Sequence, residues 1–483
     1  MSTDRRSFFT RLASTGAGLL AGVKTLASQT GTQVASVGDE HAMHHDHGSG
    51  SGHDPFETPD LPKLPWKMVD DVKEFQLIAE VVRTEFMPGR LVDAWGYNGS
   101  VPGPTIEVNE GDRVRIVFEN RLPEITTVHW HGLEVPIEMD GVPGLTMDPV
   151  QPGGTFVYEF TLHQHGTFFY HSHMAMQEML GMLGFFIIHP KQRYQPAVDR
   201  DFGFLLQEWA LLPNNTVPNT LSMEFNWLTL NGKAGPATTP VIVKQGERVR
   251  LRFVNLGMDH HPMHLHGHQF YVTGTEGGRV PEVARYPGNT VIVGVAQARD
   301  VEFEASYLGD WMLHCHLPHH MMNQMVSMVG PMSHMGSGMH TGAGMEEGMG
   351  VIRQGQALSE ELGPALGRGL GEAATRERNV THMVGQAANQ ESGHQHHQPS
   401  NEGAQQVPGF PQDMWMVMDE MFVKPETYGL RKDWTAAMMG MMSLVRVVTP
   451  EVYDHIAELK AQQPAEQPPG GQQPMHQHQH KQG

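Results

Sequence analysis

Short segments in which apolar and polar residues alternate dominate the middle of the chain. Two clear examples are Glu107 to Glu119 and Val241 to Phe253, which are rich in β-branched residues and have Gly and Pro nearby. Alternation with a period of two predicts strands with one buried face, and no long helical period competes with it. We therefore predict an all-β fold of two antiparallel β-sandwich domains, at residues 70–192 and 200–331.

The two predicted domains are two copies of one sequence. Ile106 to Asn120 reappears as Val241 to Asn255, at an offset of 241 − 106 = 135 residues. Gly166 to His173 likewise reappears as Gly309 to His316, at an offset of 309 − 166 = 143 residues. Self-similarity of this kind indicates a duplicated domain, and we place the linker between the copies near Pro190 to Arg200.

The second copy holds the only cysteine of the chain, Cys315, between two histidines. One thiolate, two imidazoles and a weak thioether form the ligand set of a blue electron-transfer copper. The run from His314 to Met325 offers Cys315, His320 and Met325 for this set, and the family resemblance described below implies His261 as the second imidazole. In an extended segment His314 and His316 point away from Cys315, so they can hold another metal a short covalent path away.

The first copy lacks the ligands for a blue copper. The two offsets give it Thr126 in place of His261, Ser172 in place of Cys315, Gln177 in place of His320 and Met182 in place of Met325. It nevertheless keeps two histidine pairs, at His129 to His131 and at His171 to His173. These histidines must therefore serve a different, shared metal site.

The histidine-rich segments resemble, in order, the four copper-binding signatures of the multicopper oxidases over roughly residues 70–330. The segments are His129 to Gly132, His171 to His173, His261 to Gly267 and His314 to Met325. The resemblance implies two cupredoxin-type Greek-key domains and four copper ions per active unit. It also implies a laccase-like oxidase, which takes single electrons from a small phenolic or Cu(I) substrate and reduces O2 to water.

Residue roles follow from the resemblance position by position. For a type 1 copper it implies His261, Cys315, His320 and axial Met325. For a type 2 copper it implies His129 and His264. For a type 3 copper pair, which completes a trinuclear cluster, it implies His131, His171, His173, His266, His314 and His316.

The spacing between the second and third signatures resembles that of the shorter multicopper oxidases. Only 261 − 173 = 88 positions separate the second signature from the third, which resembles two-domain, laccase-like (small laccase) oxidases with the type 1 copper in domain 2. Such members imply a homotrimer with trinuclear clusters at the subunit interfaces. Asp140 resembles an acidic residue that follows the first signature in the family, which implies a proton donor. The alternative interpretation is that Asp140 is simply an exposed turn residue before Gly141.

Other functions have to be weighed. A copper nitrite reductase shares the fold but needs its cysteine in the first domain, where Ser172 stands. A non-enzymatic copper-binding protein would explain the Met- and His-rich flanks but not the ligands in signature order. A phenol-oxidising laccase and a cuprous oxidase for copper tolerance both stay open. Nearby methionines favour Cu(I) access, although ordinary packing also explains them: Met321, Met322, Met328 and Met332.

The N-terminal flank has the features of an export segment. Arg5-Arg6 ahead of the apolar stretch Leu12 to Ala27 resembles a twin-arginine signal. We expect a signal peptide at residues 1–36, a His-rich linker at 37–69 and a periplasmic or secreted protein. No other stretch reaches the roughly 18 apolar residues of a membrane span, so we expect none in the mature chain.

The C-terminal flank is rich in soft copper ligands. We expect a low-complexity Gly/Met/His linker at 332–410, a Met-rich segment at 411–460 and a Gln/Pro/His tail at 461–483. This extension is predicted to be disordered or partly helical, with a short helix from Pro450 to Lys460. The net charge of −20 and the lack of a basic stripe argue against nucleic acid as a partner.

Overall fold

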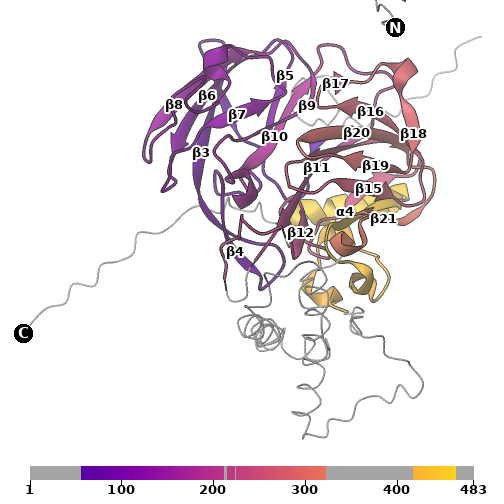
Figure 1. The fold of residues 1–483 in the computed structure, drawn as a ribbon. Helices are drawn as coiled ribbons and strands as arrows, with labels where there is room; N and C mark the ends of the chain where they lie inside the picture. Colours follow the sequence, from indigo (N-terminus) through magenta and orange to yellow (C-terminus); the bar gives the residue numbers. More distant parts are fainter. Residues whose placement is uncertain (1–55, 212–214, 224, 322–416, 464–483) are drawn as a thin grey trace, which may run out of the picture. The chain divides into compact units, whose positions relative to one another are not determined.

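The computed structural model describes residues 56–211, 215–223, 225–321 and 417–463 (Figure 1). Strands form most of the regular structure in these residues, and four sheets pair into two β-sandwich domains, each with its own apolar core. The predicted all-β fold is confirmed. The predicted signal peptide and the low-complexity linker lie outside the described residues.

Domain 1 consists of a five-stranded and a four-stranded sheet. The five-stranded sheet contains β2 (Trp66–Val69), β3 (Val72–Glu85), β4 (Leu91–Tyr97), β6 (Arg113–Asn120) and β8 (Thr155–Thr161). The four-stranded sheet, in spatial order, contains β5 (Ile106–Asn109), β10 (Leu183–His189), β9 (Gly166–Ser172) and β7 (Val128–His131). The alternation in β6 buries Val114, Ile116 and Phe118 in the core between the sheets.

Domain 2 consists of an eight-stranded and a five-stranded sheet. The larger sheet contains β1 (Phe56–Glu57), β11 (Arg200–Trp209), β12 (Trp227–Leu230), β14 (Arg248–Asn255), β16 (Phe270–Thr275), β17 (Gly278–Arg279), β18 (Tyr286–Gly288) and β20 (Gln297–Glu304). The smaller sheet, in spatial order, contains β13 (Val241–Lys244), β22 (Met442–Val448), β21 (Gly309–Cys315), β15 (His261–Leu265) and β19 (Thr290–Val293). Cys315 and Met441 both lie in the core between these sheets.

The sheets are mixed, so the prediction of purely antiparallel sandwiches is wrong in part. β3 runs parallel to β6, β11 runs parallel to β14, and β13 runs parallel to β22. The chain between the strands of each pair passes through the opposite sheet, and such crossovers allow parallel neighbours. Alternation of apolar residues does not reveal strand direction, because it is the same in both cases.

The segment 417–463 adds a strand to the interior of the smaller sheet of domain 2. β22 lies between β13 and β21, and all seven of its residues are buried. The Met-rich pattern of residues 411–460 predicts a separate segment and gives no sign of this strand. The structure therefore places part of that segment in the same sheet as β21, which ends at Cys315.

Helical structure in the described residues is short. The 3₁₀ turns are η2 (Ile137–Met139), η3 (Glu178–Leu180), η4 (Glu282–Ala284), η5 (Pro318–Met321), η9 (Asp419–Met421), η10 (Pro425–Thr427) and η11 (Trp434–Ala437). The α-helix α4 (Pro450–Gln462) confirms the predicted helix, and its Ile456 packs against Ile242 of β13 and Val448 of β22. No helix in these residues has both the length and the apolar character that crossing a membrane requires.

A buried ionic network joins the two domains. Arg252 of β14 donates to both carboxylate oxygens of Asp201 in β11, and also to the hydroxyl of Thr167 in β9 at 2.6 Å. Thr167 in turn donates to Asp300 of β20 at 2.6 Å. Buried charges are costly unless they are paired, and Thr167 of domain 1 completes the hydrogen bonding of this buried group in domain 2.

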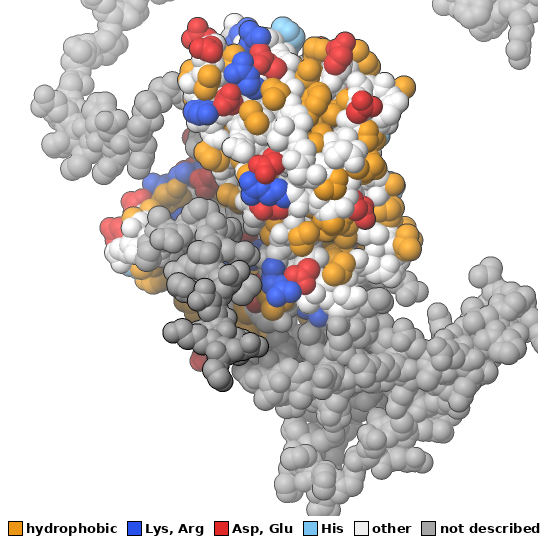
Figure 2. Space-filling view, turned by 90° about the vertical axis from the view of Figure 1, so that its left-hand side faces the viewer, with side chains coloured by type: hydrophobic (Ala, Val, Ile, Leu, Met, Phe, Trp, Pro, Cys, Tyr) orange, Lys and Arg blue, Asp and Glu red, His pale blue; other side chains and the backbone are white. Residues whose placement is uncertain are grey.

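The outer sheet of domain 1 carries its charges in pairs. Arg115 lies 3.2 Å from Glu74 and 2.6 Å from Glu159, and Arg83 lies 2.6 Å from Asp93. Figure 2 views the side of β3, β6 and β8, where Lys and Arg side chains lie beside Asp and Glu side chains. This face therefore has no stripe of a single charge.

Candidate metal centre

A buried cluster in domain 2, called the trio below, brings together Cys315, His261 and His320. The Sγ atom of Cys315 lies 3.8 Å from Nδ1 of His261 and 3.5 Å from Nδ1 of His320. The two nitrogens are 3.1 Å apart, and all three side chains are buried. His261 begins β15, Cys315 ends the adjacent strand β21, and His320 lies in the turn η5 that follows.

Burial shifts the pKa of His320 and of Cys315 in the trio. It lowers the pKa of His320 to about 3 and raises the pKa of the Cys315 thiol to about 12. A neutral imidazole offers a lone pair, whereas the thiol has to lose its proton before it binds a metal ion. A set of one thiolate and two imidazole nitrogens fits copper.

Glu208, which the sequence analysis did not single out, holds His261 in place. Its Oε2 lies 3.0 Å from Nε2 of His261, and its Oε1 accepts the backbone N–H groups of Met258 and Asp259. Donation from Nε2 leaves the Nδ1 lone pair free to face Cys315. The sequence feature that could have identified Glu208 is an acidic residue within the largely apolar stretch Phe202 to Trp209.

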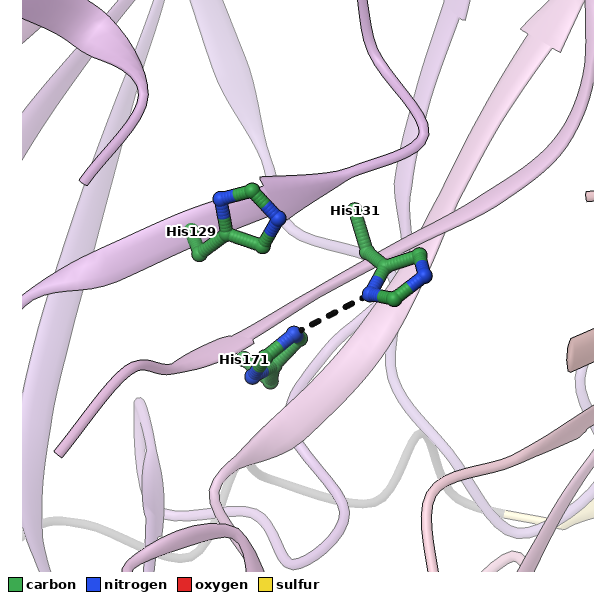
Figure 3. Close-up of side chains that lie close together, drawn as sticks. All are labelled: His129, His131 and His171. Carbon is green, nitrogen blue, oxygen red and sulfur yellow. Dashed lines mark hydrogen bonds between the residues drawn. The ribbon is translucent and has the colours of Figure 1, made fainter. Parts of the chain in front are cut away.

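Four histidines of domain 1, called the first quartet, gather at the ends of β7 and β9. His129 and His131 lie on β7, His171 lies on β9 directly opposite His129, and His173 follows β9. Nδ1 of His131 lies 3.3 Å from Nε2 of His171, and Figure 3 shows the three strand-borne rings converging from the two strands. The ring centroids of His129 and His173 are 5.3 Å apart.

Domain 2 repeats this arrangement in a second quartet of His264, His266, His314 and His316. His264 of β15 pairs with His314 of β21, as His129 pairs with His171 in domain 1. The Nε2 atoms of His266 and His314 lie 3.0 Å apart. A pocket of about 400 Å³ adjoins the second quartet, and its lining includes His264, Gly267, His268 and Asn289.

Backbone carbonyl groups orient four of the eight imidazole rings, two in each quartet, in the same way. The Nδ1 atoms donate as follows: His129 to Asp140 at 2.7 Å, His171 to Ser172 at 2.7 Å, His264 to Asn289 at 2.7 Å and His314 to Cys315 at 2.8 Å. Donation from Nδ1 leaves the Nε2 lone pair for a metal ion. Burial also lowers the pKa of His171 to about 3, so this ring is neutral at pH 7.

The two quartets stay apart within one chain. Among the residues that the structure describes, no hydrogen bond or ring contact joins a histidine of one quartet to a histidine of the other. His173 of the first and His316 of the second are exposed, whereas the trio is buried. Each quartet is therefore open to solvent on one side at His173 or His316.

Asp140 lies beside the first quartet. Its carboxylate Oδ1 is 3.5 Å from Nδ1 of His129, in addition to the bond that this nitrogen makes to the Asp140 carbonyl. Gly141 follows with a φ of 84°, and a Cβ there would overlap the carbonyl of Val128, so only glycine fits. The turn thus holds His129 and keeps a carboxylate close to it. Proton delivery by Asp140 stays a prediction.

The first copy fills its counterpart of the trio with hydrogen bonds. Oε1 of Gln177 accepts from the hydroxyl of Thr126 at 2.8 Å and from the hydroxyl of Ser172 at 2.7 Å, and all three side chains are buried. These are the counterparts that the repeat offsets give. The counterpart of the trio in domain 1 therefore offers only hydroxyl and amide groups, and no thiolate or imidazole. Met325, the predicted axial ligand, lies outside the described residues.

Comparison with known proteins identifies the family. Two multicopper oxidase family models match the chain, one over residues 80–193 and the other over residues 211–331. A Copper resistance protein A homolog of Pseudomonas syringae pv. tomato is 43% identical over 122 residues, which are 25% of this chain and 21% of that protein. Laccase-2 of Botryotinia fuckeliana is 32% identical over 248 residues, covering 46% and 41% of the two chains.

The chain spans less than half the length of these two relatives. Among solved structures, the blue copper oxidase from Nitrosomonas europaea aligns with a TM-score of 0.48 at 32% identity, over 52% of this chain and 81% of that chain. The ranges matched by the family models contain the trio and both quartets. This chain therefore belongs to the multicopper oxidase family, as a two-domain, laccase-like member.

Proposed function

We propose that the chain is a copper-dependent oxidase that takes single electrons from a reducing substrate and reduces O2 to water. The position of Cys315 carries this proposal. Its Sγ faces His261 and His320, while the neighbouring His314 belongs to the second quartet and bonds the Cys315 carbonyl at 2.8 Å. Bound copper would supply one-electron redox chemistry at both ends of this short covalent path.

Residue roles in the proposal follow the geometry of the trio and the quartets. The trio binds the type 1 copper. His129 and His264 bind the type 2 copper, as the family resemblance implies for the first histidines of the two His-x-His-Gly segments. The type 3 ligands are His131, His171, His173, His266, His314 and His316. Four copper ions then serve each active unit, and Asp140 supplies protons beside His129.

The two quartets assemble between subunits in this proposal. The first quartet of one subunit covers the second quartet of the next, which accounts for the exposure of His173 and His316 and for the pocket beside His264. A head-to-tail contact of this kind has to close into a ring to leave no quartet uncovered. The family resemblance favours a ring of three, and hence a homotrimer with three interfacial clusters.

The reducing substrate donates its electron near His320. Nε2 of His320 lies 3.4 Å from the carboxylate of Asp259, whose side chain is 37% exposed, and His319 lies beside them. This carboxylate can accept a phenolic O–H or attract a cation. Phenols and Cu(I) are therefore both proposed substrates.

A cuprous oxidase for copper tolerance is the second candidate function. Methionines that pack next to η5 favour it: Met312, Met321, Met438 and Met442. Similarity to the Copper resistance protein A homolog also favours it. Export through the twin-arginine route, to the periplasm or beyond, is part of both proposals and rests on Arg5-Arg6 and the apolar stretch that follows.

Oxygen consumption by purified, copper-loaded protein tests the proposed function. We expect a blue thiolate absorption band, O2 uptake with dimethoxyphenol and with Cu(I), and an active species whose light-scattering mass is that of about three chains. Faster turnover of Cu(I) than of the phenol at equal concentration would favour the second candidate. An active monomer would contradict the shared cluster, and failure to consume O2 with either donor would contradict the oxidase.

A further inference from the structure

Met182 of domain 1 joins the two ends of the loop that corresponds to the type 1 site. The backbone N–H of Ser172 donates to the carbonyl of Met182 at 3.1 Å, and the N–H of Met182 donates to the carbonyl of Gln177 at 3.4 Å. The Met182 side chain is fully buried in the core of domain 1. One residue thus connects the counterpart of Cys315 with the counterpart of His320.

Met441 makes the same two bonds in domain 2. The N–H of Cys315 donates to the carbonyl of Met441 at 3.0 Å, and the N–H of Met441 donates to the carbonyl of His320 at 2.9 Å. The Met441 side chain is also fully buried, in the core cluster that contains Cys315. Met441 therefore occupies, next to the trio, the place that Met182 occupies in domain 1.

The strands that follow these methionines correspond as well. β10 and β22 have seven residues each, and each runs parallel to the first strand of its sheet and antiparallel to the strand that carries the second histidine pair. Leu183 lies opposite His171 in β9, as Met442 lies opposite His314 in β21. The two methionines immediately precede these strands, so the strand register itself pairs Met182 with Met441.

The offset between the copies therefore changes within the metal-binding loop. It is 320 − 177 = 143 residues at the second imidazole position and 441 − 182 = 259 at the methionine. In the sequence, residues 322–416 separate His320 from β22. Met325 keeps the linear spacing of Met182, but the backbone position that joins Cys315 to His320 is already taken by Met441.

From these contacts we infer that Met441, and not Met325, is the axial thioether ligand of the type 1 copper. The inference deepens the proposed oxidase function, because it names the fourth ligand of the same site. The thioether of a buried methionine is a weak, soft donor of the kind that completes a blue copper site. The ligand set is then His261, Cys315, His320 and Met441, of which the last arises 441 − 315 = 126 residues after the thiolate.

Paired substitutions at the two methionines test this assignment on the copper-loaded, full-length protein. The axial donor tunes the reduction potential and the spectrum of such a site. We expect Met441→Leu, which removes a donor to Cu(II), to raise the type 1 potential. Met441→Gln, which offers a harder oxygen donor, should lower the potential and change the electron paramagnetic resonance spectrum. Both substitutions leave the backbone bonds to Cys315 and His320 available.

The same substitutions at Met325 and at Met182 are the matched controls, and we expect neither to move the potential or the spectrum. Shifts in the Met325 variants with none in the Met441 variants would overturn the assignment, as would no shift at either position. Should the Met441 variants not fold, X-ray absorption of selenomethionine-labelled Met325→Leu protein decides, because copper–selenium scattering should persist. Wild-type protein without a blue band would instead contradict the proposed function itself.

Discussion

Oε2 of Glu208 lies 3.0 Å from Nε2 of His261, and both side chains are fully inaccessible to solvent. The carboxylate also accepts two backbone N–H groups, from Met258 and Asp259, which offset the cost of its burial. A carboxylate bound to the remote nitrogen of a ligand imidazole raises the basicity of that imidazole and fixes its orientation. Glu208 thus acts on the metal site through His261, as a positioning residue.

Glu208→Gln should raise the type 1 reduction potential and weaken copper binding at this site by roughly tenfold or more. The reason is that an uncharged amide no longer favours the more positive oxidation state. A redox titration followed at the blue band measures the potential. Asp259→Asn is the matched control, since Asp259 is 37% exposed and lies 3.4 Å from His320, and its effect should be smaller. Equal shifts in both variants would show only a general loss of negative charge.

Cys315→Ser should abolish the blue band and the oxidation of every reducing substrate, while copper bound to the quartets is kept. Cys315 is the only cysteine of the chain, so no other residue can provide a thiolate. Absorption spectra and copper content, measured on the same sample, check both parts. The assignment fails if the variant stays blue.

His129→Ala and His264→Ala should each remove O2 reduction and leave the blue band in place. Neither ring contacts the trio, and each bonds a carbonyl in its own quartet. O2 uptake and absorbance, compared with wild type, separate the two effects. His163→Ala provides a control at an exposed histidine outside both quartets and should retain full activity. Normal O2 uptake in both quartet variants would remove His129 and His264 from the cluster.

A chain that ends at Gly330 should fail to form a stable, blue protein, whereas a chain that ends at Gln463 should succeed. The shorter chain lacks β22, with which β13 and β21 pair. Burial of Met441, Val445 and Val447 alone stabilises the fold by roughly 6 kcal/mol, a large part of the stability of an ordinary domain. Thermal unfolding and absorbance distinguish the two chains, and a soluble blue product from the shorter chain would contradict the role of β22.

The buried pair of Glu302 with Arg250 predicts sensitivity to acid. Burial by itself would raise the pKa of Glu302, but hydrogen bonds and charges from Arg279 and Arg250 outweigh it and lower the pKa to about 2. The unfolded chain therefore binds a proton more readily than the folded one. The stabilisation, about 3 kcal/mol, is complete above the unfolded pKa near 4.5 and is lost as pH falls toward 2.

Denaturation midpoints of copper-free wild type and Glu302→Gln, measured between pH 6 and pH 3, check this expectation. The difference in stability between the two proteins should shrink as the pH falls. Glu304→Gln is a suitable control, because Glu304 is an exposed residue on the same strand β20. A difference that does not change with pH would show that the pKa of Glu302 is the same in the folded and unfolded states, contrary to the prediction.

The sequence contained enough to predict the two sandwich domains and which residues converge in the trio and in each quartet. Period-two alternation marks half-buried strands such as β6, and the duplicated pattern aligns His129 with His264. The first signal is local in the sequence, and the second repeats at a fixed spacing, so a single sequence reveals both. Strand direction was not encoded in this way, so the parallel pairing of β3 with β6 was missed.

Glu208 and β22 were missed for a different physical reason. Each acts on the metal-binding loop from a distant part of the sequence, and one sequence does not reveal which distant segments meet. Glu208 lies 53 positions before His261, and in sequence it is a single acidic residue in an apolar strand. β22 is preceded by a long Met- and Gly-rich region, which hides its relation to β10 because the spacing of the repeat is broken there.

The position of β22 also sets an order of events during synthesis. A ribosome makes about 5 to 20 residues per second, so the 126 residues between Cys315 and Met441 take roughly 6 to 25 seconds. Until β22 emerges, β13 and β21 have no strand between them, and the thiol of Cys315 lies at an unfinished sheet. Completion of the sheet around Cys315 thus has to wait for the synthesis of β22, so the surroundings of the thiol are finished only after an interval set by the length of the intervening segment.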